Sequence, residues 1–67
     1  MTMNEHIRQK MKRLGVTQVE LIKKLHSDYG ITVQPPEMSQ IISGVNTYPK
    51  AQRVLDAVET ILAEMDN

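Results

Sequence analysis

Glycine and proline divide this sequence into four short segments, and that division limits the possible folds more than any other feature. Gly15, Gly30 and Gly44 each follow a stretch in which apolar residues recur every three or four positions. Pro35 and Pro49 precede the third and fourth stretches. Glycine favours the left-handed conformation that ends helices, and proline is tolerated in a first helical turn. No stretch alternates apolar and polar residues, so we predict an all-α fold of four helices around one core.

The first two stretches have recognisable helix ends. Apolar residues at helical spacing predict a helix over residues 3–14. Thr17, three residues before Glu20, forms a capping box that predicts the start of a second helix. We expect its buried stripe to consist of Leu21, Ile22 and Leu25. The periodicity weakens after His26, so residues 26–33 are predicted to form a long turn whose conformation stays open.

The other two stretches predict a short helix and a long one. Two prolines and a carboxylate suit a first turn, which predicts a third helix over residues 34–43 with Met38 and Ile41 facing inward. The fourth helix, over residues 49–65, has the clearest amphipathic pattern. We expect its apolar positions to be Ala51, Val54, Leu55, Val58, Ile61, Leu62 and Met65.

Composition predicts one small domain over residues 1–67 and excludes several functions. The chain has no cysteine, and His6 lies far from His26, so we expect no metal site and no cofactor. No Cys-His or Ser-His-Asp set and no phosphate-cradling glycine loop is present. We therefore expect neither an enzyme nor a small-molecule ligand. No apolar run is long enough to span a membrane, and the start lacks a signal peptide, so a cytoplasmic protein is expected.

Charge is balanced overall but unevenly distributed. The net charge is zero, yet residues 1–53 hold eight cations and four acids, whereas residues 54–67 hold four acids and no cation. Such asymmetry fits a basic working face and an acidic last helix that points elsewhere. Ordinary solvated charge on four helices explains it equally well.

Two motifs resemble the Cro-like repressors of phages and bacteria. The stretch Thr17-Gln18-Val19-Glu20-Leu21-Ile22-Lys23-Lys24-Leu25 resembles the scaffold helix of that family. Residues 33–44 are similar to its recognition helix. The resemblance implies a lambda-repressor-like helix-turn-helix domain whose third helix enters the major groove of double-stranded DNA. It also implies a transcriptional repressor of phage or mobile-element type. The departures are Ile22, His26 and a turn lengthened by about six residues.

The resemblance assigns DNA contacts to particular residues. It places Gln18 on a phosphate at the start of the second helix and Gln40 on a base edge, where glutamine can pair with adenine. The outward side of the third helix adds Gln34, Glu37, Ser39 and Ser43. Only apolar contact, for example with a thymine methyl, is open to Pro35 and Pro36. The DNA backbone is assigned to Asn46, Thr47, Tyr48 and Lys50.

Several alternatives stay open at this level. Glu37 is equally explained as a partner of the helix dipole, and Tyr48 as a lid on the core. Additional cationic contacts come from Lys10, Arg13 and Arg53, unless these are plain surface charges. The whole domain is alternatively a protein-interaction module, such as an antitoxin-like or anti-repressor partner on the same fold.

Assembly follows from the size of the expected site. One short helix reads few base pairs, so specific binding needs two copies and predicts a homodimer. The candidate surface is the helix over residues 49–65, where Leu62 and Met65 exceed what a small core is expected to cover. The alternative is that both side chains pack on the first helix, under Met3 and Ile7.

Overall fold

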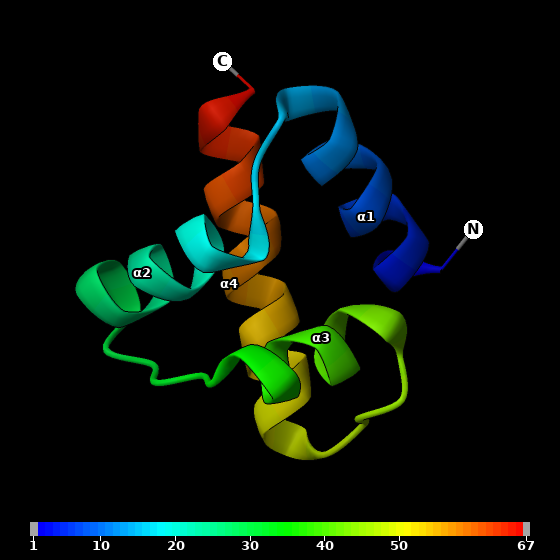
Figure 1. The fold of residues 1–67 in the computed structure, drawn as a ribbon, viewed down its shortest axis with the longest axis vertical. Coiled ribbons are helices and arrows are strands. Elements are labelled where there is room, and N and C mark those ends of the chain that lie inside the picture. Colours follow the sequence, from blue (N-terminus) through cyan, green and yellow to red (C-terminus); the bar gives the residue numbers. More distant parts are fainter. Residues whose placement is uncertain (1, 67) are drawn as a thin grey trace.

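The computed structural model describes residues 2–66 and confirms an all-α fold (Figure 1). The four helices are α1 (Met3–Leu14), α2 (Gln18–Tyr29), α3 (Pro35–Ser43) and α4 (Pro49–Met65). Both α3 and α4 contact each of the other three helices, whereas α1 and α2 do not pack on each other. In Figure 1, α4 begins at the lower end of the molecule and ends at the top beside the last turn of α1. None of the helices in this part of the chain is long and apolar enough to cross a membrane.

Local signals place the helix ends. The Thr17 hydroxyl accepts a hydrogen bond from the Glu20 N–H at 3.3 Å, which confirms Thr17 as the N-cap of α2. Thr2 caps α1 in the same way, through the Glu5 N–H at 3.2 Å. At the C-terminal end of α3, Gly44 adopts φ 86°. This left-handed conformation costs glycine little because it has no Cβ atom. These bonds satisfy backbone groups that a helix end otherwise leaves unpaired.

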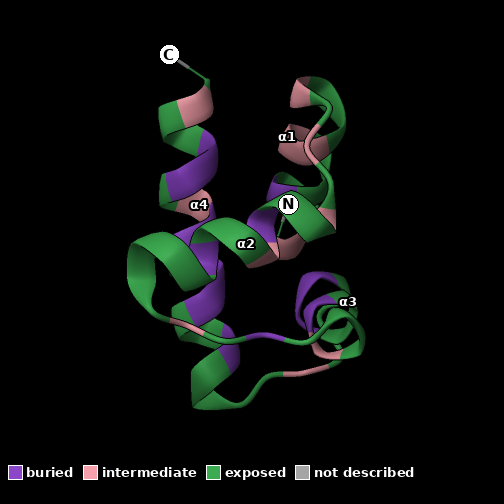
Figure 2. Cartoon of the chain, turned by 60° about the vertical axis from the view of Figure 1, so that its left-hand side comes forward, coloured by how far each residue is buried: buried purple, intermediate pink, exposed green. Residues whose placement is uncertain are grey.

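The core lies where the four apolar stripes meet. The predicted inward residues of α3 and α4 are buried, apart from Met65, which is half-buried, and α3 also buries Ile42. The prediction for Ile22 was too strong, since its side chain is only partly buried at the edge of the core. In Figure 2 the buried parts of α4 face the other three helices. The fully buried large side chains are Ile7, Leu21, Leu25, Met38, Ile41, Leu62, Val54 and Val58.

Leu62 does not belong to an exposed dimer face. Its side chain is 0% exposed and shares the core with Ile7 of α1, while Met65 is half-buried. The prediction that Leu62 is left uncovered is wrong, because α1 packs along α4 and covers its last turns. The alternative, in which Leu62 and Met65 pack on the first helix under Met3 and Ile7, holds for Leu62 and Ile7, which share the buried core, whereas Met65 is half-buried and Met3 is exposed.

The lengthened turn is divided between a helix and a connection. Helix α2 continues past His26 to Tyr29, and Gly30 then reverses the chain with φ 66°. The N–H groups of Gly30 and Ile31 bind back to α2 carbonyl oxygens at 3.1 and 3.0 Å. Val33, 3% exposed, anchors the connection in the core. Residues 30–34 therefore form a short tethered segment rather than a loose loop.

Asn4 joins the first and third helices. Its Nδ2 atom donates to the carbonyl oxygens of Ile41 at 2.8 Å and Ile42 at 3.3 Å. These carbonyls belong to the last turn of α3, where partners for the regular helical hydrogen bonds run out. The Ile41 carbonyl also accepts from the Gly44 N–H at 3.2 Å. The side chain is half-buried, so water replaces it incompletely when it is removed. Asn4 therefore fixes the C-terminal end of α3 against α1.

We expect Asn4→Ala to lower the free energy of unfolding by about 1 kcal/mol, because the Ile42 carbonyl loses its donor and the Ile41 carbonyl keeps only the Gly44 N–H. Chemical denaturation followed by circular dichroism measures the change. Gln9→Ala, on an exposed position of the same helix, is the matched control and leaves stability nearly unchanged. Equal stability of the two variants would contradict the tie between α1 and α3.

Candidate nucleic-acid interface

The outward side of α3 is a continuous, uncharged surface made of polar side chains and two prolines. Successive residues of a helix are rotated by about 100°, so the buried residues of α3 lie on one side of its axis. Those residues are Met38, Ile41 and Ile42. The exposed residues occupy the opposite arc and consist of Pro35, Pro36, Ser39, Gln40 and Ser43. Gln34, the exposed N-cap, precedes this arc. The structure thus brings six of the predicted contact residues together.

Backbone hydrogen bonds hold this surface in place. The Gln40 carbonyl oxygen accepts from the Ser43 hydroxyl at 3.1 Å and from the N–H groups of Val45 and Asn46 at 3.0 and 3.1 Å. The Gln40 side chain is exposed and forms no hydrogen bond to any residue in 2–66. Its amide is therefore available to a ligand, while its backbone is fixed by the helix end.

Glu37 does not share the outward side, contrary to the prediction. Its carboxylate is half-buried, and both of its oxygens lie 3.2 Å from the Lys50 Nζ atom at the start of α4. The reason is the helical rotation, which places position 37 beside the inward residues. Glu37 and Lys50 were assigned to different DNA groups, but the structure pairs them with each other.

Helix N-termini differ in what they offer to an anion. In α2, Thr17 takes the Glu20 N–H, and the first-turn N–H groups of Gln18 and Val19 remain without intrahelical partners. In α3 the first two helical residues are prolines, which have no N–H. Of these two helices, α2 is therefore the one whose start offers more free backbone N–H groups to a phosphate. Gln18, half-buried, lies at this point.

The loop between α3 and α4 exposes two large side chains. Tyr48 is 75% exposed and Val45 is 76% exposed, so Tyr48 does not cover the core. Asn46 is half-buried, and its Oδ1 atom accepts from the Tyr48 N–H at 3.2 Å, which shapes the turn into α4. Thr47 is exposed between them. The loop presents one aromatic ring beside α3.

Positive charge is not concentrated on α3. The chain has no lysine or arginine in residues 25–49. At the opposite end of the molecule, the Asp66 carboxylate lies 2.7 Å from the Arg13 guanidinium and 3.9 Å from the Lys10 ammonium. These two cations thus belong to a link between α1 and the end of α4. The expected basic working face is not formed around the third helix.

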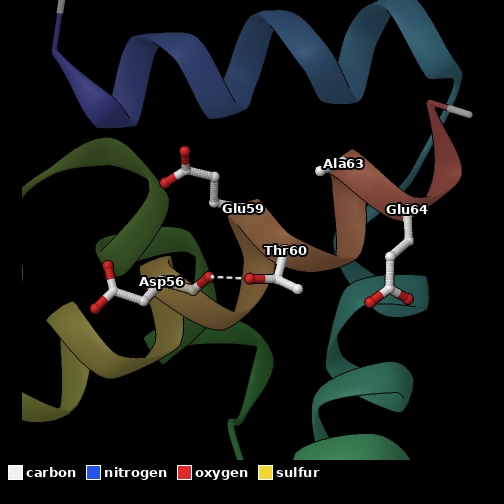
Figure 3. Close-up of a pocket in the computed structure, with 5 residues that line it drawn as sticks. All are labelled: Asp56, Glu59, Thr60, Ala63 and Glu64. Atoms are coloured by element: carbon white, nitrogen blue, oxygen red, sulfur yellow. Dashed lines mark hydrogen bonds between the residues drawn. The ribbon is translucent and has the colours of Figure 1, made fainter.

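The outer side of α4 is acidic. A shallow pocket of about 470 Å³ is lined by Asp56, Glu59, Thr60, Ala63 and Glu64. Figure 3 shows that the three carboxyl groups point apart rather than toward a common centre. No three His, Asp or Glu side chains in residues 2–66 come together in a way that suits a metal ion. This side repels a phosphate backbone.

Sequence reasoning did not find two features of this region. Asn4 interrupts an apolar stripe three residues before Ile7, and such a polar residue on an inward face is a signal for a buried hydrogen bond. The exposure of Val45 has no sequence signal that we can name.

Comparison of the chain with protein-family models, curated proteins and solved structures gives no match.

Proposed function

We propose that the protein binds double-stranded DNA sequence-specifically and places α3 in the major groove. The observation that supports this most strongly is the outward side of α3, where Gln40, Ser39 and Ser43 are exposed on a helix whose back is buried. A major groove about 12 Å wide admits one α-helix. Polar, uncharged side chains on a fixed helix suit the recognition of base edges.

Each part of the surface has a role in this proposal. The Gln40 amide donates to and accepts from adenine, and the serine hydroxyls bind bases or backbone. Two prolines in the first turn of α3 give apolar contact with thymine methyl groups. They have no N–H group of their own that would need a partner. The start of α2, with Gln18, and residues 46–48 bind phosphates on either side of the groove.

The biological consequence proposed for such binding is repression of transcription. A domain this small blocks a promoter by occupying it, and that suits a regulator of phage or mobile-element type acting in the cytoplasm. Two copies on a two-fold site supply the affinity that one short helix lacks. Their contact surface has to lie outside the buried Leu62.

Selection of binding sites from random duplex DNA tests the proposal directly. We expect the purified protein to select duplexes that share a short sequence motif. If two copies bind, the motif consists of two half-sites about 10 base pairs apart. Mobility shifts at increasing salt then separate backbone contacts from base contacts. Recovery of no motif, together with no mobility shift on random duplex at low salt, contradicts DNA binding.

A protein-interaction module is the second candidate. It is favoured by the exposed Val45 and Tyr48 and by the lack of cations in residues 25–49. Aromatic residues are enriched in the centres of protein interfaces. The same experiments distinguish the two candidates. Under this alternative neither the wild type nor Tyr48→Ala binds DNA, and Tyr48→Ala no longer binds the protein partner that the wild type captures.

Substitutions of Lys50 and Glu37 are expected to change DNA affinity in opposite directions. We expect Lys50→Ala to weaken binding evenly across sequences and to lower the salt slope by about one, because a phosphate contact is lost. Glu37→Gln is expected to strengthen binding, since it releases the Lys50 ammonium from its carboxylate at 3.2 Å. Mobility shifts on a cognate and a random duplex measure both effects.

The pair also tests whether Glu37 contacts a base. If Glu37 accepts a hydrogen bond from a cytosine amino group, Glu37→Gln alters preference at one base pair. An even gain across sequences indicates that Glu37 acts only on Lys50. An unchanged salt slope in Lys50→Ala would refute the phosphate contact.

A further inference from the structure

We propose that Arg53, Lys50 and the connection between α2 and α3 form a phosphate-binding pocket at the edge of the recognition surface. The proposal rests on the DNA-binding function proposed above and extends it to the connection between α2 and α3, which has no assigned role, and joins this connection to Lys50 and Arg53. A pocket of about 300 Å³ lies between this connection and the first turns of α4. Its lining residues are Gly30, Ile31, Thr32, Lys50 and Arg53.

The charges of the pocket suit an anion. Lys50 and Arg53 stand three residues apart on α4, so their side chains lie on adjacent turns of the same side. No carboxylate lines the pocket. Arg53 is exposed and forms no ion pair with any residue in 2–66. Asp56, one turn further along α4, binds the Gln52 side-chain amide at 3.0 Å instead. The Arg53 guanidinium is therefore available to a ligand, and its fork of donors matches phosphate oxygens.

The connection between the helices adds neutral donors. The N–H groups of Gly30 and Ile31 are used in closing α2. The next N–H, that of Thr32, takes part in no hydrogen bond within the described part of the chain, and the Thr32 hydroxyl is exposed. A phosphate in the pocket thus meets the free Arg53 guanidinium, the Lys50 ammonium that Glu37 also binds, one hydroxyl and one backbone N–H. This combination is typical of phosphate contacts in DNA complexes.

The position of the pocket relates it to α3. The Lys50 ammonium is bonded to Glu37 in the first turn of α3, so the pocket lies beside the N-terminal end of that helix. Figure 1 shows the connection, α3 and the start of α4 together at the lower end of the molecule. Arg13 and its partner Asp66 lie where α1 and α4 end, at the top. When α3 occupies a groove, the phosphates that border the groove approach its flanks. The lengthened turn thereby becomes part of the DNA contact.

Arg53→Gln tests the pocket, with Arg13→Gln as the matched control. We expect Arg53→Gln to weaken binding to a cognate and a random duplex alike, by about tenfold, and to lower the salt slope by about 0.9. Arg13→Gln is expected to bind as the wild type does, because its guanidinium lies at the other end of the molecule. Thermal unfolding followed by circular dichroism checks that both variants fold. Equal binding by Arg53→Gln and the wild type overturns the pocket.

Titration with inorganic phosphate separates this proposal from DNA binding itself. We expect the NMR signals of the Thr32 amide and the Arg53 Nε–H group to move with phosphate but not with chloride at equal ionic strength. These shifts are expected to disappear in Arg53→Gln. If the wild type binds phosphate there but no duplex DNA, the pocket stands and the proposed function fails. If phosphate moves neither signal, the pocket is overturned, and duplex binding then decides the function by itself.

Discussion

Leu62→Glu is expected to unfold the protein. Leu62 is 0% exposed, and a carboxylate at this position has no partner in the apolar core. Burial of an unpaired charge costs more than about 4 kcal/mol, whereas a domain of this length has a total stability of about 3 to 10 kcal/mol. Far-ultraviolet circular dichroism measures the loss of helix.

Two further variants make this expectation specific. Leu62→Ala removes packing without adding charge and is expected to cost about 2 to 5 kcal/mol, measured by chemical denaturation. Ala63→Gln changes the next residue, which is exposed on the same helix, and leaves stability nearly unchanged. A helical Leu62→Glu variant with wild-type stability would show that the end of α4 is not packed as described and would revive the dimer surface.

Gln40→Ala is expected to leave folding intact while costing about 1 to 3 kcal/mol of discrimination at a single base pair. The side chain is exposed and touches no core residue, so stability does not change. Its loss removes one base-edge contact and leaves the phosphate contacts in place. Competition of the selected duplex against single-base variants measures the change at each position.

The control for this variant is Gln9→Ala, an exposed glutamine on α1. It is expected to change neither affinity nor base preference. An equal loss on all sequences in Gln40→Ala would mean that the side chain binds the backbone rather than a base. Together with Arg53→Gln, this variant distinguishes base recognition by α3 from phosphate binding by the pocket.

The candidate site combines features that depend on different parts of the chain. Gln40 is presented by a helix held through Asn4, and Lys50 reaches the same helix through Glu37. A change in the α1 to α3 tie is therefore expected to disturb recognition indirectly. Asn4→Ala measured in the same DNA assays shows how much of the affinity depends on a fixed α3.

Local interactions made much of the fold predictable from the sequence. The capping of α2 by Thr17 and the end of α3 at Gly44 involve residues within a few positions of each other. Such interactions depend on backbone conformation and on the nearest side chains, which the sequence states directly. Apolar periodicity likewise predicted the inward residues of α4, because one face of a helix has to be covered.

Contacts between distant residues were decided by the tertiary structure. Asn4 binds a carbonyl 37 positions away, and Arg13 binds Asp66 53 positions away. The sequence left open whether Leu62 is covered by α1 or exposed, and only the packing of α1 along α4 settled this in favour of burial. The pairing of Glu37 with Lys50 depends in the same way on how the chain turns between α3 and α4. Sequence thus determined where helices begin, end and present apolar faces, since these are local properties. The structure determined which charges are paired and which surfaces remain open, because those depend on helices brought together from separate parts of the chain.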